Sequence, residues 1–324
     1  MTASTASIQS RAMLAQLNIK IWSAQKLDKA ATRKTTTDAQ AVSDAARVNK
    51  RLLAGQDATL KAIATIASAA RTDYYHLTSP WQDGSAILSV SLWKELQGKL
   101  EVYERDFAAA VRIFLDDYAQ SRERAKFALG SLFNDNDYPS PYKVESKFSF
   151  SFAFDSLPNA GDWRIELADA DAEMLRKDLE TRANARFANA MRDVWQRLYD
   201  ACEHIKTTLP AYDAGTAKRF NDTLIGNLQD LLRILPALNI AADPALAALA
   251  DRAAADLATL DPQTLRDSPA TRTRATNAAA EICRTMAQHL GIAAPSAAPI
   301  SAPTPTHGPA LVIDLFAPAI RTAA

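Results

Sequence analysis

Two long, regular stripes of apolar residues constrain this chain more than any other feature of its sequence. Both advance in steps of three or four residues, which places their members on one face of an α-helix. The first stripe comprises Leu92, Leu96, Leu100, Tyr103, Phe107, Val111, Phe114 and Tyr118. The second comprises Leu175, Leu179, Ala183, Phe187, Met191, Val194, Leu198, Cys202 and Ile205. At a rise of ~1.5 Å per residue each helix spans on the order of 50 Å, and each needs a neighbour to cover its apolar face.

Glycine is scarce, with 9 in 324 residues. Doubly wound and barrel enzymes use glycine in tight turns and where backbone approaches a ligand, whereas long helices avoid it. The composition therefore favours a mainly α fold. We predict an elongated helical bundle in which the two long helices pack antiparallel as a coiled-coil hairpin.

A small β element is expected beside these helices. Residues 146–154 alternate aromatic with small or polar side chains, and residues 162–167 alternate again after a Pro-Asn-Ala-Gly-Asp turn. This pattern predicts an antiparallel β-hairpin with one aromatic face. An isolated hairpin is marginal in water, so the short alternating segment 17–22 is a candidate third strand. We expect the aromatic face to pack in the core, and base stacking on it is the alternative.

Four segments follow one another along the chain. Residues 1–210 are predicted to form the long-helix bundle with its β element, and residues 211–291 a bundle of shorter helices separated by prolines. Residues 292–310 are rich in Ala and Pro, which is typical of a disordered linker. Residues 311–317 are apolar again, and we predict that they form a short docking motif.

The tail motif has a specific resemblance. Ile313, Asp314, Leu315 and Phe316 resemble the end of the bacterial sliding-clamp-binding pentapeptide, although Val312 stands where that motif has glutamine. The resemblance implies a sliding clamp as partner. Another protein partner and docking on the protein's own body remain the alternatives.

The net charge is zero, but the first 72 residues hold 11 Lys/Arg against 4 Asp. A solvated helical face explains such an excess in most proteins. The alternative is a nucleic-acid contact on a long N-terminal helix predicted from about residue 38 to 70, with a weak point at Gly55. The candidate contact residues are Arg47, Lys50, Arg51, Lys61 and Arg71.

The sequence lacks the motifs of several enzyme classes. It holds no G-x-x-x-x-G-K-[ST], no G-x-G-x-x-G and no G-x-S-x-G, and its four histidines are scattered without metal-ligand spacing. We therefore predict no catalytic residue, no cofactor and no metal. The most enzyme-like cluster is Asp73, Tyr75 and His76 with nearby Trp81, which we interpret as an aromatic plug at one end of the bundle.

Location is predicted from what the sequence lacks. No stretch reaches the ~18 continuous apolar residues of a membrane span, and the first residues lack the apolar core of a secretory signal. Cys202 and Cys283 form no C-x-x-C pair, which favours a reducing compartment. We expect a protein of the bacterial cytoplasm without membrane contact, and homo-oligomerisation remains open.

Six short segments carry a family resemblance: Leu17–Ser23, Arg47–Leu53, Pro80–Trp81, Phe148–Ser151, Ala160–Ile165 and Leu235–Ile240. Through them the chain resembles, over most of residues 15–290, an uncharacterised family of bacteriophage and prophage proteins. It implies a phage or prophage context, with genes for MoxR-type AAA ATPases and von Willebrand-type metal-binding proteins nearby. It implies no catalytic residues, and the tail lies outside it.

Together these features predict a non-enzymatic helical scaffold or adaptor of phage or prophage origin that acts in a protein assembly. An AAA ATPase or a replication factor such as the sliding clamp is the expected partner. The alternative is a DNA-binding protein of phage replication or recombination that uses the basic N-terminal helices.

Overall fold

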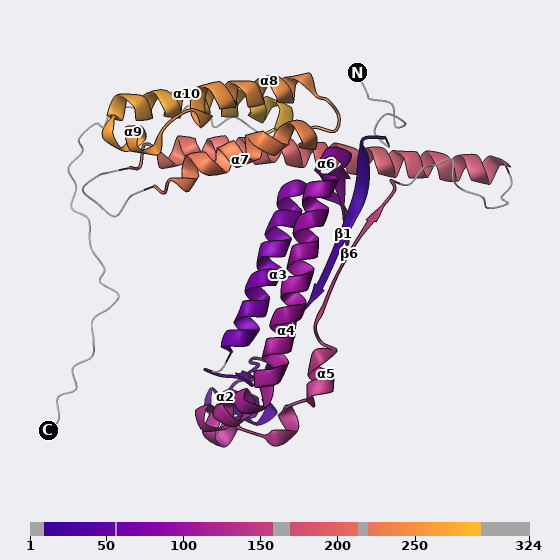
Figure 1. The fold of residues 1–324 in the computed structure, drawn as a ribbon, viewed down its shortest axis with the longest axis vertical. Coiled ribbons are helices and arrows are strands. Elements are labelled where there is room, and N and C mark those ends of the chain that lie inside the picture. The colour runs from indigo at the N-terminus through magenta and orange to yellow at the C-terminus, as the bar shows by residue number, and fades with distance from the viewer. Residues whose placement is uncertain (1–9, 56, 158–168, 213–219, 293–324) are drawn as a thin grey trace.

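The molecule consists of a long stalk with a helical crossbar at one end and a small foot at the other (Figure 1). The stalk contains α3, α4, β1 and β6, and the crossbar contains α6 to α10. The foot comprises residues 23–55 and 125–148. This computed structural model describes residues 10–55, 57–157, 169–212 and 220–292. No helix within these ranges is both long and apolar enough to cross a membrane.

The two stalk helices, α3 (Ala58–Leu77) and α4 (Trp93–Leu129), run antiparallel along each other. The first predicted stripe is the buried face of α4. Its Phe107, Val111 and Phe114 share a core with Ile63 and Ala67 of α3. The predicted long helix of the second half of the chain is therefore not the neighbour of α4, because α3 already covers its apolar stripe.

A four-stranded antiparallel sheet, in the order β4-β5-β1-β6, completes the stalk. Its strands are β1 (Ala12–Lys20), β4 (Ser79–Gln82), β5 (Ser85–Ser89) and β6 (Ser149–Asp155). β6 pairs with β1 from Leu14 opposite Asp155 to Lys20 opposite Ser149, so the N-terminal segment is the predicted additional strand. The sequence did not indicate β4 and β5. The predicted strand 162–167 lies outside the described residues.

The aromatic face of β6 packs against α4, as predicted. Phe150 lies 5.6 Å from Phe107 between ring centroids, and Trp93 lies 6.4 Å from Phe154. Ser149, Ser151 and Ala153 alternate with these rings on the other, exposed face. The period of two along the strand separates the two faces.

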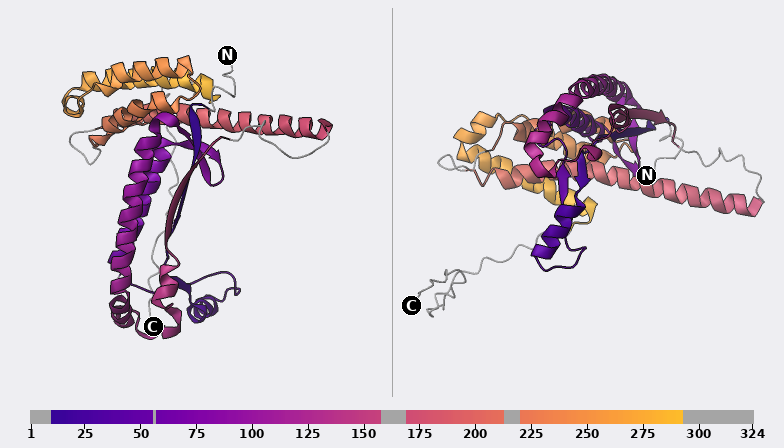
Figure 2. Two further views of the ribbon diagram at one scale, coloured as in Figure 1. Left: turned by 45° about the vertical axis from the view of Figure 1, so that its right-hand side comes forward. Right: turned by 90° about the horizontal axis from the view of Figure 1, so that it is seen from below.

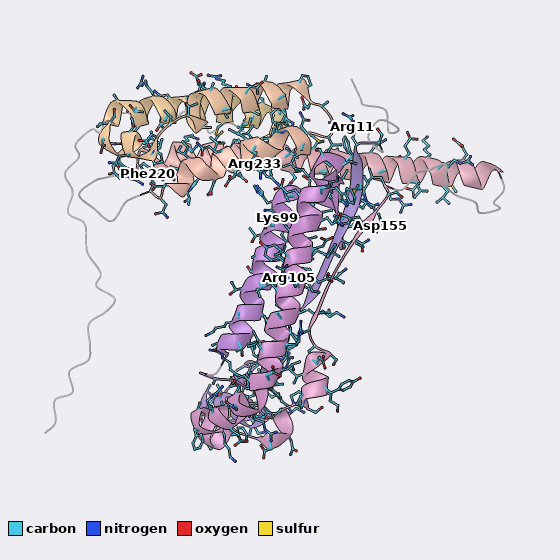
Figure 3. All side chains as sticks on the ribbon, in the orientation of Figure 1. Arg11, Lys99, Arg105, Asp155, Phe220 and Arg233 are labelled. Carbon is cyan, nitrogen blue, oxygen red and sulfur yellow. The ribbon has the colours of Figure 1, made fainter. Side chains whose placement is uncertain are left out.

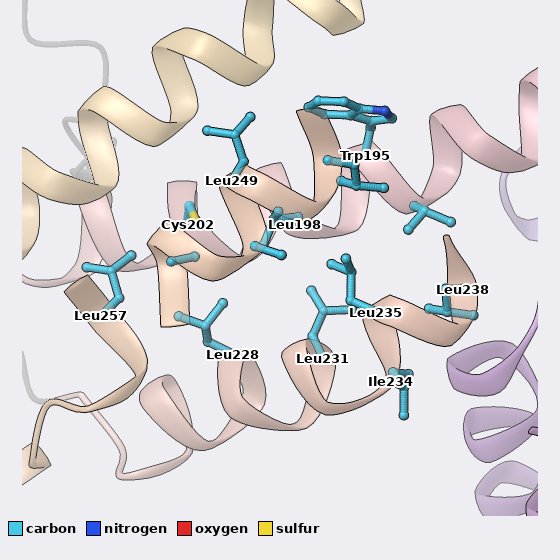
Figure 4. Packing of buried hydrophobic residues seen from close by; sticks show 14 of the residues in the cluster. Trp195, Leu198, Cys202, Leu228, Leu231, Ile234, Leu235, Leu238, Leu249 and Leu257 are labelled. Carbon is cyan, nitrogen blue, oxygen red and sulfur yellow. The ribbon is translucent and has the colours of Figure 1, made fainter. Parts of the chain in front are cut away.

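The crossbar is built around α6 (Asp169–Thr208), whose second half packs against α10 and α7. The shorter helices are α7 (Thr223–Leu238), α8 (Pro244–Ala253), a π-helical turn η5 (Ala254–Ala258), α9 (Pro262–Asp267) and α10 (Pro269–Leu290). The helices α8, α9 and α10 each begin with a proline behind an Asp or Ser cap, which gives three sharp starts. Figure 4 shows Leu198 and Cys202 of α6 facing the leucines of α7. This core joins residues on both sides of the domain boundary predicted at residue 210.

The two long helices cross instead of forming the predicted antiparallel hairpin (Figures 1 and 2). The stripe on the second half of α6 is already covered by α7 and α10. Polar contacts fix the crossing. Arg233 of α7 pairs with Glu95 of α4 at 3.3 Å, close to the stalk residue Lys99 in Figure 3. Arg197 of α6 donates to the carbonyl oxygens of His76 (3.1 Å) and Thr78 (2.6 Å) at the end of α3.

The predicted N-terminal long helix is wrong over residues 39–57. Those residues contain β3 (Asn49–Arg51), which pairs with β2 (Gln25–Leu27), and α2 (Lys29–Asp38) precedes them. Leu52 and Leu53 supply the apolar pattern, but they are buried at the strand end instead of on a helical face. Gly55 has φ +73°, a left-handed conformation that interrupts any helix, and α3 begins only at Ala58.

Candidate functional site

The foot is the part of the molecule that gathers most of the sequence-predicted basic residues. It joins β2, α2 and β3 to the end of α4 and to the short helices η2 (Gly130–Leu132), η3 (Asp135–Asp137) and α5 (Pro141–Glu145). The two chain segments that form it are about 80 residues apart in sequence, as the hydrogen bond from Lys50 Nζ to the Leu132 carbonyl oxygen (2.8 Å) shows. Tertiary contacts must therefore hold it together.

A buried ion cluster provides one set of these contacts. Lys50 and Asp137 form an ion pair, and their side chains are 9% and 7% exposed. Asp28 lies 3.6 Å from the same Lys50 ammonium, and Lys26 binds the other oxygen of Asp137 at 2.7 Å. Burial by itself raises the pKa of Asp137, but hydrogen bonds from Lys26 and Lys50 outweigh it and hold that pKa below its ordinary value. All four charges are therefore engaged with one another.

Tyrosine hydroxyls provide the second set. Tyr138 donates to the Leu52 carbonyl oxygen at 2.6 Å, and Tyr118 donates to the Pro139 carbonyl oxygen at 2.9 Å. Burial raises the pKa of Tyr138 to about 12, so its hydroxyl remains a donor at every physiological pH. The guanidinium of Arg122 lies 5.6 Å above the same ring. These bonds make the foot a rigid frame.

Exposed apolar side chains are concentrated on this frame. The three most exposed large apolar side chains among the described residues are Phe127 (88%), Tyr142 (80%) and Val42 (71%), and all three belong to the foot. Leu27 and Leu132 of the foot are also exposed. Scattered exposed apolar residues are normal on a protein surface, and five such side chains lie in the two short segments that form the foot. These residues were not predicted from the sequence, because exposed and buried aromatic residues look alike in a sequence.

The five basic residues proposed as DNA contacts do not form one free surface. The Lys50 side chain is largely covered and pairs with Asp137, and Arg51 and Lys61 both pair with Asp57. Arg71 donates to the Ile19 carbonyl oxygen at 3.1 Å, on the stalk rather than in the foot. Of these five residues, only Arg47 is exposed and forms no ion pair within the described part of the chain.

A different basic group is free to reach a ligand. Lys29, Arg33 and Lys34 are exposed on α2, and none of them forms an ion pair within the described part of the chain. Asp28 caps this helix by accepting from the Ala31 N–H at 2.9 Å. The cap stabilises the start of α2, and the three basic side chains on it are exposed to solvent. In the sequence this group contributes to the basic excess of the first 72 residues. The predicted nucleic-acid contacts, Arg47 to Arg71, lie further along the chain.

The enzyme-like cluster at the end of α3 is divided by the helix. Asp73 faces α4, where it accepts from Lys99 (3.0 Å) and Tyr103 (2.8 Å). Tyr75 is 63% exposed, and His76 is half-buried. Burial, followed by the charge of Arg197, lowers the pKa of His76. Asp73 and His76 are one turn apart on α3, whereas Tyr75 lies two residues from Asp73 and points in a different direction.

No group of three or more His, Cys, Asp or Glu side chains that could hold a metal occurs within the described ranges. The tail motif, Ile313 to Phe316, lies outside them. Comparisons with family models, with curated proteins and with solved structures found no match for this chain. The resemblance to the phage family therefore stays a prediction, and the geometry alone must support a function.

Proposed function

We propose that this protein is a non-enzymatic helical scaffold or adaptor, and that the foot is the surface at which a protein partner docks. One observation carries the proposal: the most exposed apolar side chains, Phe127, Tyr142 and Val42, lie on a rigid frame at the far end of the stalk. Aromatic side chains dominate the energetics of protein interfaces. The crossbar lies at the opposite end of the stalk, so its surface is well separated from the foot (Figure 1).

Rigidity favours this use of the foot. A partner that binds a preformed surface does not have to order it, so less of the contact energy is lost. The buried pair of Lys50 with Asp137 and the bond from Tyr138 to the Leu52 carbonyl oxygen hold the two foot segments in place before any partner arrives.

The partner classes proposed here are an AAA ATPase and a replication factor such as the sliding clamp, in a phage or prophage setting. In this proposal the tail residues Ile313, Asp314, Leu315 and Phe316 would provide a second contact for the same assembly. When two binding sites are linked in one chain, binding at the first raises the effective concentration of the second, so the overall affinity exceeds that of either site alone.

DNA binding is the second candidate function, and α2 favours it. Lys29, Arg33 and Lys34 place three exposed positive charges on a capped helix, near exposed Arg47 in the sequence. Phosphate contacts by such a group would make the affinity fall steeply with salt concentration.

Site-specific photocrosslinking tests the adaptor proposal. A photoreactive phenylalanine analogue replaces Phe127 in one protein and the exposed mid-stalk residue Ile113 in a matched control. We expect a discrete crosslinked partner at position 127 that is absent at position 113 and is lost when Tyr142→Ser is added. Equal crosslinking at both positions, or none at either, contradicts the proposal.

A salt titration of DNA binding separates the two candidates. The triple variant Lys29→Gln/Arg33→Gln/Lys34→Gln is compared with Lys61→Gln, which removes an exposed charge on α3 that is paired with Asp57. DNA binding through α2 predicts a loss only in the triple variant, together with a smaller salt slope. Binding that both variants retain unchanged rules out α2 as the contact.

A further inference from the structure

A pocket of about 570 Å³ lies where the crossbar meets the stalk, away from the foot (Figure 1). Its walls come from the end of α3, from β4 and β5 with the turn between them, and from α6. A volume of this size is typical of sites for small molecules. The side chains that a molecule in the pocket can touch therefore indicate what the site binds.

Several polar atoms of the wall are out of reach of such a molecule. The hydroxyls of Ser79 and Ser85 and the Nε1 atom of Trp81 are buried beneath the surface, without hydrogen-bond partners among the described residues. The Tyr74 hydroxyl is engaged, because it donates to the Ala15 carbonyl oxygen at 2.7 Å. The polar lining that a molecule can reach consists of side chains with exposed surface: Tyr75, Gln82, Asp83, Asn189, Asp193 and Arg197.

The charges of this lining indicate the kind of ligand. Two carboxylates, Asp83 and Asp193, and one guanidinium, Arg197, give the pocket a net charge of −1. Arg197 lies 2.7 Å from Asp193 Oδ2 and donates to two backbone carbonyl oxygens at the end of α3, so the protein itself occupies it. Asp83 is exposed and forms no ion pair within the described ranges. The unmatched charge of the pocket is therefore negative.

Asp193 adds to the demand for positive charge. Its Oδ2 atom is buried and, although Arg197 is close, accepts no well-aligned hydrogen bond within the described part of the chain. Buried polar atoms are nearly always hydrogen-bonded, so this carboxylate is stabilised less than usual. A ligand does not reach Oδ2, but a cation in the pocket stabilises the carboxylate through its charge, without direct contact.

Two well-supported groups indicate the shape of the cation. Asp83 and Gly84 form the two-residue turn between β4 and β5, and Gly84 has φ +79°, so a tight turn holds the backbone that carries the carboxylate. Tyr75 is 63% exposed, and its ring packs edge-on against the buried Tyr74 ring, at 5.4 Å between centroids. The face of an aromatic ring attracts a cation, and guanidinium groups stack flat on it.

We propose that this pocket binds a small organic cation with a flat guanidinium or amidinium group. The group stacks on the Tyr75 ring and donates to the Asp83 carboxylate, because planar N–H donors match a carboxylate with two parallel hydrogen bonds. The site goes beyond the proposed adaptor function, since it is separate from the foot and does not depend on a protein partner.

Fluorine NMR of the full chain labelled with 3-fluorotyrosine tests the site, with benzamidine as the probe. The Tyr75 signal is assigned with Tyr75→Phe. Benzamide and benzoate have the same ring and nearly the same shape as benzamidine, but are neutral and negatively charged. We expect benzamidine to shift the Tyr75 signal in a saturable way, benzamide to bind more weakly and benzoate to bind most weakly. A Tyr75 signal that no compound moves, that all move equally, or that benzoate moves at the lowest concentration overturns the proposal.

Asp83→Asn provides a second readout, with affinities measured by calorimetry. It should weaken benzamidine binding roughly tenfold, the effect of a lost hydrogen bond to a charged group, and leave the weaker binding of benzamide nearly unchanged. The control is Asp116→Asn, which removes an exposed carboxylate from α4 outside the pocket and should change neither affinity. Both variants should keep the melting temperature of the parent, because both side chains are exposed. Equal benzamidine affinity of the parent and Asp83→Asn contradicts the assignment of this carboxylate.

Discussion

Replacing Lys50 by methionine tests whether this residue holds the foot together or contacts a ligand. Its side chain is 9% exposed, and its ammonium binds Asp137 and donates to the Leu132 carbonyl oxygen at 2.8 Å. Methionine retains most of the apolar stem but leaves the carboxylate of Asp137, which is 7% exposed, with Lys26 alone at 2.7 Å. Removing one partner of a buried pair costs about 3–5 kcal/mol, and the remaining Lys26 places this case near the lower end, about 3 kcal/mol.

Hydrogen exchange measured by mass spectrometry detects this loss of stability in the peptides of the foot. A destabilisation of about 3 kcal/mol corresponds to roughly 100-fold faster exchange of amides protected by the foot. Lys61→Met is the matched control, because Lys61 is 69% exposed in its ion pair with Asp57 and should cost less than about 1 kcal/mol. The double variant Lys50→Met/Asp137→Leu should recover most of the protection, since an apolar pair replaces an unpaired charge. Equal effects of Lys50→Met and Lys61→Met, or no recovery in the double variant, would refute this reasoning.

Four further predictions concern pH and the core. Because the pKa of Asp137 is lower in the folded chain than its ordinary value of 3.8, its contribution to stability is present above about pH 4 and is lost as the pH falls further; acid titration of foot exchange checks this. The pKa of His76 is also lowered, so the unfolded chain takes up this proton first and stability falls as the pH drops below about 6.5; His76→Gln should remove that part of a pH–stability curve. Burial raises the pKa of both Cys202 and Cys283 to about 12, so neither thiol should react with a disulfide reagent at pH 8 until urea unfolds the crossbar. Leu198→Ala empties a fully buried position of the crossbar core and should cost about 2–5 kcal/mol in urea denaturation, whereas the exposed Met174→Ala should cost far less.

The sequence determined which face of each local element is apolar. Phe107, Val111 and Phe114 lie on the buried side of α4, and Phe150 lies on the buried side of β6, because periods of 3.6 and two residues fix these faces within one helix or strand. Pro244, Pro262 and Pro269 were visible as breaks between the short helices, because proline does not continue a preceding helix.

Only the tertiary structure decided which faces meet. An apolar stripe specifies that it must be covered and does not specify by what, so α4 pairs with α3 while α6 pairs with α7 and α10. The same holds for polar groups. Lys50 and Arg47 look alike in sequence, yet the Lys50 side chain is largely covered because Asp137, 87 residues away, is brought beside it. The unpaired hydroxyls of Ser79 and Ser85 depend likewise on what surrounds them, and long-range packing alone sets those surroundings.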